Sequence, residues 1–179
     1  MAEKLLVVNL YGGPGIGKST LASSVFAELK KLHIDAELIG EYAKKVVWRG
    51  DLETLGDQIY VLGKQHNRQF NLQGKCEVAV TDSPFMLSCI YNNFYTNYKN
   101  LTALALEAYQ RFNNLNYVIE RPEGYNPNGR VQTEEEARAV DTAIAELLRE
   151  QQLPYRTVQL ETAVWNIIKD VREVLDAQR

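Results

Sequence analysis

Residues 12–19 read Gly12-Gly13-Pro14-Gly15-Ile16-Gly17-Lys18-Ser19 and satisfy the pattern GxxxxGK[ST]. An apolar run, Lys4–Leu10, precedes the pattern, and a helical periodicity runs from Lys18 to Leu32 after it. Glycines in such a loop let backbone N–H groups approach phosphate oxygens, and the following helix adds its N-terminal dipole. The strand, loop and helix together therefore predict a site for a nucleoside triphosphate.

The pattern also predicts a role for individual residues. Lys18 would bridge the β- and γ-phosphates, Ser19 would ligate Mg²⁺ through its hydroxyl, and Thr20 would contact the α-phosphate. The expected cofactors are therefore ATP and Mg²⁺. The residues predicted to bind the nucleotide are Gly12, Gly13, Gly15, Ile16, Gly17, Lys18, Ser19 and Thr20.

Short apolar runs alternate with helical segments along the rest of the chain, which favours an α/β fold. We predict a three-layer P-loop NTPase fold with a five-stranded parallel sheet, like that of nucleoside and nucleotide kinases. The 179 residues fit one domain over 1–179, with a lid loop at about 121–133. The further predicted strands are Ala36–Ile39, Glu77–Thr81, Asn116–Glu120 and Tyr155–Leu160.

Polar residues ahead of the helical periodicities are expected to be N-caps. After the first of them the helix would bury Leu55, Ile59, Leu62 and Phe70. The expected caps are Asp51, Ser83 (with Pro84 in the first turn), Thr133 (with Glu136 completing a capping box) and Thr162.

Two carboxylates follow predicted strands, where ligands of parallel α/β sheets are found. Asp82 ends the third strand and could hold Mg²⁺ directly or through water; alternatively it caps the helix near Pro84. Glu41 follows the second strand and could accept or orient the proton of an attacking hydroxyl. Its alternative is an ordinary first-turn glutamate favoured by the helix dipole.

The loop 121–132 contains two arginines among prolines and glycines. Arg121 and Arg130 could stabilise the transferring phosphoryl group as the lid closes, or could be charges on a solvated loop. Planar side chains near the acceptor side could stack on a heterocycle, although isolated aromatics more often belong to the core. The candidates are Tyr42, Trp48, Arg49 and Tyr125.

The overall charge indicates no broad electrostatic hold on nucleic acid. The chain has 20 Lys and Arg against 23 Asp and Glu, a net charge of −3, and no basic run stands out. DNA is therefore possible but not favoured by composition. The two cysteines form no metal-binding spacing, and no signal peptide or membrane-length apolar stretch is found, so we expect a reduced cytoplasmic protein, or one in the host cytoplasm if it is phage-encoded.

The chain resembles the NadR-type P-loop kinases, a family of ATPases and kinases of NAD metabolism in bacteria and bacteriophages. The residues that carry the resemblance are Gly12–Thr20, Glu41-Tyr42, Val78–Ser83, the lid Tyr125–Arg130 and the following Thr133–Glu136. It implies ATP-dependent phosphorylation of a nucleoside 5′-hydroxyl, as in ribosylnicotinamide kinases. By resemblance, Lys18 and Ser19 would serve the triphosphate, Asp82 the metal or the acceptor hydroxyl, and Arg130 would be the lid cation.

The sequence departs from that family in having Ser83-Pro84 where the ribosylnicotinamide kinase continues with Thr-Asp. The adenylyltransferase and DNA-binding domains of the bifunctional protein are not expected here either. Three hypotheses stay open at this point. The chain is a kinase for a small nucleoside or nucleotide, a bacteriophage kinase for a hydroxymethylated pyrimidine in DNA, or a nucleotide-binding switch without phosphotransfer. The absence of an NKxD-type guanine motif and the arginine-bearing loop favour the first over a GTPase or a switch.

Overall fold

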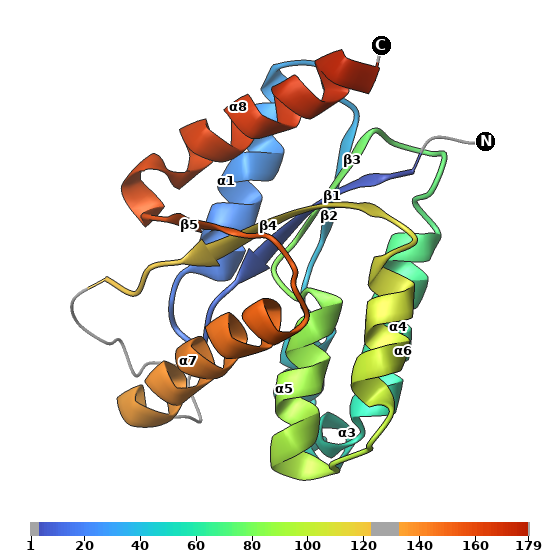
Figure 1. The fold of residues 1–179 in the computed structure, drawn as a ribbon, viewed down its shortest axis with the longest axis vertical. Helices are drawn as coiled ribbons and strands as arrows, with labels where there is room; N and C mark the ends of the chain where they lie inside the picture. The colour runs from blue at the N-terminus through green and yellow to red at the C-terminus, as the bar shows by residue number, and fades with distance from the viewer. Residues whose placement is uncertain (1–3, 123–132, 179) are drawn as a thin grey trace.

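Five strands form a single parallel sheet in the order β2–β3–β1–β4–β5 (Figure 1). The computed structural model describes residues 4–122 and 133–178. The predicted five-stranded parallel α/β architecture is confirmed. The strands are β1 Leu6–Tyr11, β2 Ala36–Ile39, β3 Val78–Thr81, β4 Asn113–Ile119 and β5 Arg156–Val158.

Helices cover both faces of the sheet and give three layers (Figure 1). One face packs against α1 and α8, and the other against the group α4 to α7. The helices are α1 Lys18–Lys31, α2 Tyr42–Trp48, α3 Leu52–Gly56, α4 Gln58–Phe70, α5 Phe85–Tyr95, α6 Leu101–Tyr109, α7 Glu134–Glu150 and α8 Leu160–Gln178.

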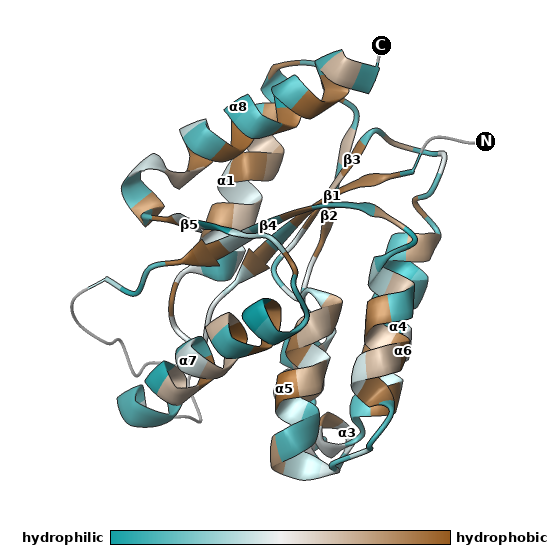
Figure 2. Ribbon diagram, in the orientation of Figure 1, coloured by the Kyte–Doolittle hydropathy of each residue, from teal (hydrophilic) through white to brown (hydrophobic). Residues whose placement is uncertain are grey.

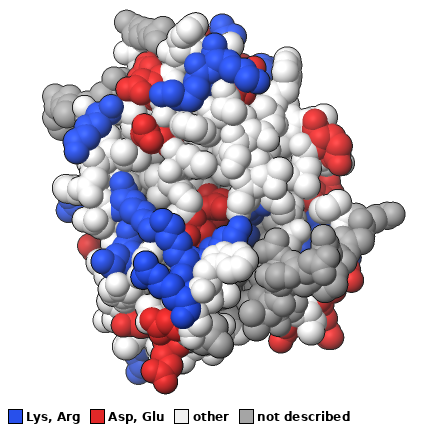
Figure 3. All heavy atoms as spheres, turned by 180° about the vertical axis from the view of Figure 1, so that it is seen from behind, with Lys and Arg blue, Asp and Glu red and all other residues white. Residues whose placement is uncertain are grey.

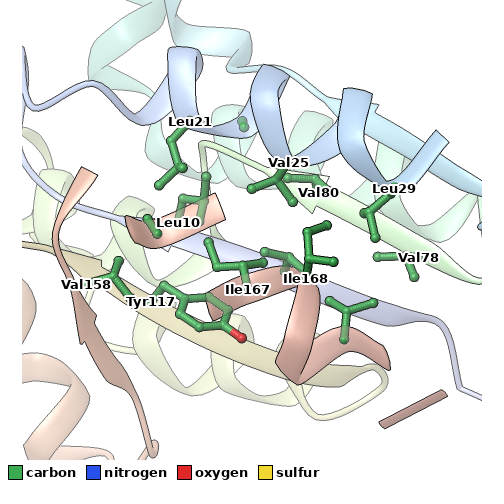
Figure 4. Close-up of a cluster of buried hydrophobic side chains, with 14 of the residues drawn as sticks. Leu10, Leu21, Val25, Leu29, Val78, Val80, Tyr117, Val158, Ile167 and Ile168 are labelled. Carbon is green, nitrogen blue, oxygen red and sulfur yellow. The ribbon is translucent and has the colours of Figure 1, made fainter. Parts of the chain in front are cut away.

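The central strand β1 is buried on both faces, which explains its nearly continuous apolar sequence. Leu6, Val8 and Leu10 point to the α1–α8 side, whereas Val7 and Tyr11 point to the other side. Figure 4 shows Leu10 among side chains of α1, β3 and α8. This alternation fixes the position of β1, and therefore the position of the loop that follows it.

The outer helices are amphipathic, with hydrophobic residues toward the sheet and polar residues toward solvent (Figure 2). In α7 the buried residues are Ala137, Val140, Ile144 and Leu148, at helical spacing. Thr133 and Glu136 form the predicted capping box at the start of this helix. The direction of α7 is thus set by a cap and an apolar stripe that are both visible in the sequence.

The expectation of one helix after Asp51 was wrong in part. Asp51 does cap, accepting the Thr54 N–H, but the helix is short, and α4 begins after a second cap, Asp57. Because α4 starts anew at Asp57, the residues that face the core are not the ones expected from a single helix. Ile59 is 47% exposed, and Phe70 at the far end is 48% exposed. Glutamines take some of the inward positions of α4 instead, at Gln58, Gln65 and Gln69.

Two further helix starts differ from the expectation. The N-cap of α5 is Pro84 rather than Ser83, whose N–H donates to the Thr81 hydroxyl at 3.1 Å. Helix α8 begins at Leu160, because β5 ends at Val158 and the last residue of the predicted strand already belongs to the helix. Thr162 therefore lies in the first turn of α8 and is not its cap.

Replacing Ile167 with alanine should destabilise the protein by about 2–5 kcal/mol, because Ile167 is fully buried between α8 and the sheet. Urea unfolding measures the change. Trp165→Ala on the same helix is the control, since Trp165 is 72% exposed and should change stability by no more than about 0.5 kcal/mol. Equal losses in the two variants would contradict the described packing of α8.

Candidate nucleotide and acceptor site

The loop between β1 and α1 needs glycine at several positions. Gly15 and Gly17 have φ angles of 79° and 98°, in the left-handed region that favours glycine. Gly17 is also the N-cap of α1, and a Cβ there would lie 3.1 Å from the side chain of Leu160. The backbone conformation of the GxxxxGK[ST] pattern is therefore the one that a phosphate cradle requires.

Lys18 bends back over this loop. Its ammonium Nζ donates to the carbonyl oxygens of Gly12 and Gly13, at 2.6 and 3.1 Å. Ser19 and Thr20 follow it in the first turn of α1 and are exposed. The positive group, the N-terminus of α1 and two hydroxyls thus lie together, as a triphosphate site requires.

A contact from α7 to the loop was not predicted from the sequence. The Asp141 carboxylate accepts the Gly13 N–H at 2.5 Å with one oxygen and the Arg121 Nε–H at 2.6 Å with the other. Arg121 also donates through Nη1 to the carbonyl of Pro14, at 3.1 Å. A Cβ at Gly13 would meet the Ala137 carbonyl oxygen, Arg121 and Asp141, so only glycine fits there. We call the group of Gly13, Pro14, Arg121 and Asp141 the loop–α7 contact.

Arg121 therefore does not lie on a solvated part of the lid. Its side chain is only 6% exposed, and its Nη2 is buried without a hydrogen-bond partner among the described residues. A buried guanidinium with a spare donor beside a phosphate loop is suited to bind a phosphate oxygen. The sequence signal for its partner was weak, since Asp141 is one of many acids on an exposed helix.

Asp82 lies at the end of β3 and is 4% exposed. Its Oδ1 is buried with no hydrogen-bond partner in the part of the chain that the structure describes. The neighbouring Thr81 hydroxyl accepts hydrogen bonds from Ser83 N–H and from Gln65 Nε2, at 3.1 and 3.2 Å. Since Pro84 is the N-cap of α5, no side chain caps that helix, and Asp82 is not used as its cap.

An orphaned carboxylate oxygen beside the phosphate loop fits a magnesium site. The described residues contain no group of three or more His, Cys, Asp or Glu that could hold a metal. Mg²⁺ in phosphoryl-transfer sites takes only one or two carboxylates, with phosphate oxygens and water completing its octahedron. Asp82 together with the hydroxyl of Ser19 would meet this requirement.

Glu41 is the N-cap of α2 at the carboxyl end of β2, although its side chain does not cap the helix. The charge of Glu41 reaches Tyr91 of α5, a residue that the sequence analysis did not single out. Burial raises the pKa of Tyr91 well above its usual range, and the negative charges of Glu41 and Asp141 raise it further. Tyr91 is thus a neutral phenol placed near both carboxylates.

The predicted acceptor residues fall into different environments. Tyr42 is partly buried, with its hydroxyl 3.2 Å from that of Tyr60, whereas Arg49 is exposed and Trp48 is 80% exposed. Neither Trp48 nor Arg49 is a core residue. Tyr125 and Arg130 lie outside the described residues.

A family model described as an AAA domain matches residues 7–165. The chain belongs to this AAA domain family. A search of curated proteins gives no match. Among the solved structures that resemble this chain is the NadR protein in complex with NR, with a TM-score of 0.66 and 17% sequence identity over 86% of this chain. Another is the thymidylate kinase of Ehrlichia chaffeensis, at a TM-score of 0.62 and 8% identity over 94% of the chain.

This chain spans 45% of the length of the NadR chain and 99% of the length of the thymidylate kinase chain. At these identities the likeness concerns the fold, which is that of P-loop kinases. None of the helices that the structure describes is long and apolar enough to cross a membrane.

Asp141→Asn should reduce the free energy of unfolding by about 1.5–3 kcal/mol. The reason is that the buried Arg121 guanidinium loses the negatively charged carboxylate that accepts its Nε–H. Urea unfolding checks this. Glu146→Gln, an exposed charge neutralisation on the same helix, is the matched control and should be close to neutral. If the two variants unfold at the same urea concentration, the loop–α7 contact does not contribute to stability.

Proposed function

We propose that the protein is an ATP-dependent kinase that transfers the γ-phosphate to a hydroxyl of a nucleoside or nucleotide-like acceptor. The observation that carries the proposal is the convergence of the phosphate loop, the orphaned Asp82 carboxylate and the anchored Arg121 at one edge of the sheet. The P-loop kinase fold supports it. A passive switch that transfers no phosphoryl group would not need a buried arginine with a spare donor beside the loop.

In this proposal the loop amides and Lys18 hold the triphosphate, and Arg121 binds oxygens of the transferring group. Ser19 and Asp82 would hold Mg²⁺, which neutralises phosphate charge when it is bound. The acceptor oxygen bonds to the γ-phosphorus, the bond from that phosphorus to the β–γ bridging oxygen breaks, and ADP leaves. The proton of the acceptor hydroxyl passes to the Glu41 carboxylate.

Tyr91 and Asp141 act as positioning residues in the same proposal. Tyr91 of α5 is within reach of the charges of both Glu41 and Asp141. Asp141 fixes the direction of the Arg121 guanidinium through its Nε–H, which leaves Nη2 available for phosphate. From the sequence pattern and the family resemblance, Arg130 is proposed as the lid cation and Tyr125 as a lid residue that stacks on the acceptor.

The resemblance to NadR-type kinases favours a ribosylnicotinamide-like acceptor, and a hydroxymethylated pyrimidine in DNA is the second candidate. The cation–ring pairs Lys64–Tyr60 on α4 and Arg68–Tyr42 between α4 and α2 favour this second candidate, since both kinds of group bind nucleic acid. The experiment is an ATP-consumption screen across free nucleosides, nucleoside monophosphates and DNA with hydroxymethylated bases. ADP released only with an acceptor supports the kinase, whereas ATP binding without ADP release under any acceptor would leave a nucleotide-binding switch.

Lys18→Ala should abolish turnover in that screen and weaken ATP binding, because its ammonium is the positive charge nearest the predicted phosphate cradle. Lys31→Ala, at the other end of α1 and exposed, is the control and should keep full turnover. Turnover and calorimetric ATP affinity are measured on samples with matching circular dichroism. Near-normal turnover in Lys18→Ala would remove the phosphate-loop assignment.

Asp82→Asn should lower kcat at least about 100-fold, since losing a metal-supporting carboxylate removes several kcal/mol of charge stabilisation. Raised Mg²⁺ should recover part of the rate in the variant and leave the wild type unchanged. Rates are measured over a Mg²⁺ titration with ATP saturating. A variant with unchanged rate and unchanged Mg²⁺ dependence would make Asp82 a structural residue.

A further inference from the structure

Helices α2 and α4 present cations and aromatic rings together on one exposed surface. The surface consists of Tyr42 from α2, Arg49 at the C-cap of α2, and Tyr60, Lys64 and Arg68 from α4, and we call it the aromatic–cation surface. Tyr42 and Arg68 are half-buried in it, and the other three residues are exposed. Seen from behind, Lys and Arg side chains gather beside a hollow in which acidic atoms are exposed (Figure 3). The surface begins one residue after Glu41, the proposed acceptor of the hydroxyl proton.

The rings and charges alternate across the two helices. Tyr42 and Tyr60 pack edge to face with ring centroids 5.7 Å apart. Arg68 lies over the Tyr42 ring and Lys64 over the Tyr60 ring, each at 5.2 Å from the centroid. Arg68 also donates to the carbonyl of Gly40, at 2.9 Å, and this bond fixes α4 to the carboxyl end of β2.

Arg49 completes the surface from the other end. The hydrogen bond from Tyr42 lowers the pKa of Tyr60, and the charges of Lys64 and Arg49 lower it further. No acid within 4.0 Å pairs with Arg49, Lys64 or Arg68 in the part of the chain that the structure describes. Asp51 is near Arg49, but its carboxylate accepts hydrogen bonds from Thr54.

We propose that the aromatic–cation surface binds single-stranded nucleic acid, so that the acceptor hydroxyl reaches the site as part of a strand; this rests on the proposed kinase function. Unpaired cations would bind backbone phosphates, and exposed rings would stack on bases. The exposed row of side chains on α4 from Tyr60 to Arg68 extends about 12 Å along the helix axis. This length exceeds the size of one phosphate group. Trp48, 80% exposed at the end of α2 and adjacent in sequence to Arg49, offers a further ring.

A strand fits these groups better than a duplex or a free nucleoside. A duplex keeps its base faces stacked inside, so the rings of Tyr60 and Trp48 would have nothing to stack on. A free nucleoside carries no phosphate and would leave Arg49 and Lys64 without a partner. The position beside Glu41 would bring one nucleotide of a bound strand to the phosphate loop.

The test is fluorescence anisotropy with a labelled single-stranded oligonucleotide, in the presence of ADP and Mg²⁺, across a range of salt concentrations. Arg49→Glu/Lys64→Glu should weaken binding at least about 10-fold and reduce the slope of log K against log salt by about 1.4, at about 0.7 per phosphate contact. The control is Lys169→Glu/Arg172→Glu on α8, which changes the net charge equally and should bind like the wild type. Tyr60→Ala should weaken binding about 5- to 150-fold through lost stacking.

Equal weakening in the two charge-reversed variants, or no binding by the wild type at low salt, would overturn the proposal. Tighter binding to a duplex of the same sequence would overturn it too, in favour of a groove-binding surface. Binding is measured without phosphotransfer, so the two proposals fail separately. If the strand binds through this surface but no acceptor leads to ADP formation, the proposed kinase function is wrong. If the wild type binds no strand, and the wild type and Arg49→Glu/Lys64→Glu turn over free nucleosides equally, the proposed role of the surface is wrong.

Discussion

The arrangement of the site depends on one backbone contact, the Gly13 N–H held by the Asp141 carboxylate. Because a Cβ at Gly13 would collide with α7, glycine at this position allows the helix to approach the phosphate loop as closely as it does. The same carboxylate binds Arg121, which in turn binds the carbonyl of Pro14. Arg121 lies at the end of the chain segment that leaves β4, and α7 begins with the capping box at Thr133. Arg121 and helix α7, which flank residues 123–132 in the sequence, therefore both contact the loop that would hold the phosphates.

The parallel sheet brings the other candidate groups to the same place. The register aligns Asn9 with Thr81 and Thr81 with Ile39, so the residues that follow these strands leave the sheet at one edge. Those residues are the glycines of the loop, Asp82, and Gly40 with Glu41. Arg68 donates to the Gly40 carbonyl and fixes α4 at this edge. The strand order alone thus converts residues far apart in the sequence into one site, and helices α2 and α4 continue it outward.

Local sequence patterns predict much of this structure. The apolar run of β1, the glycine pattern and the capping box each depend on neighbours within a few residues, and each was predictable.

The predictions that were wrong or missed have a physical reason too. Ile59 was expected to be buried because a single helix was expected, and the cap at Asp57 changed its phase. Asp141 and Tyr91 were missed because their partners are remote: Asp141 is 128 residues from Gly13, and no periodicity or spacing relates them. Arg121 was predicted as a lid cation, but its burial results from that same remote partner.

Net charge is a poor guide to what the α2–α4 surface binds. The chain carries −3 overall, yet a bound phosphate responds mainly to charges within about 8 Å at physiological salt. Two acids border this surface, and their carboxylates accept hydrogen bonds at helix starts: Asp51 accepts from Thr54, and Asp57 accepts the Tyr60 N–H. Much of the negative charge lies elsewhere, as in the first turn of α7 with Glu134, Glu135 and Glu136. Arg49, Lys64 and Arg68 have no ion-pair partner within 4.0 Å in the described part of the chain, so a phosphate would not have to displace a carboxylate. An acidic protein can therefore present a local surface that attracts polyanions, and the arrangement of the helices, not the composition, decides where it lies.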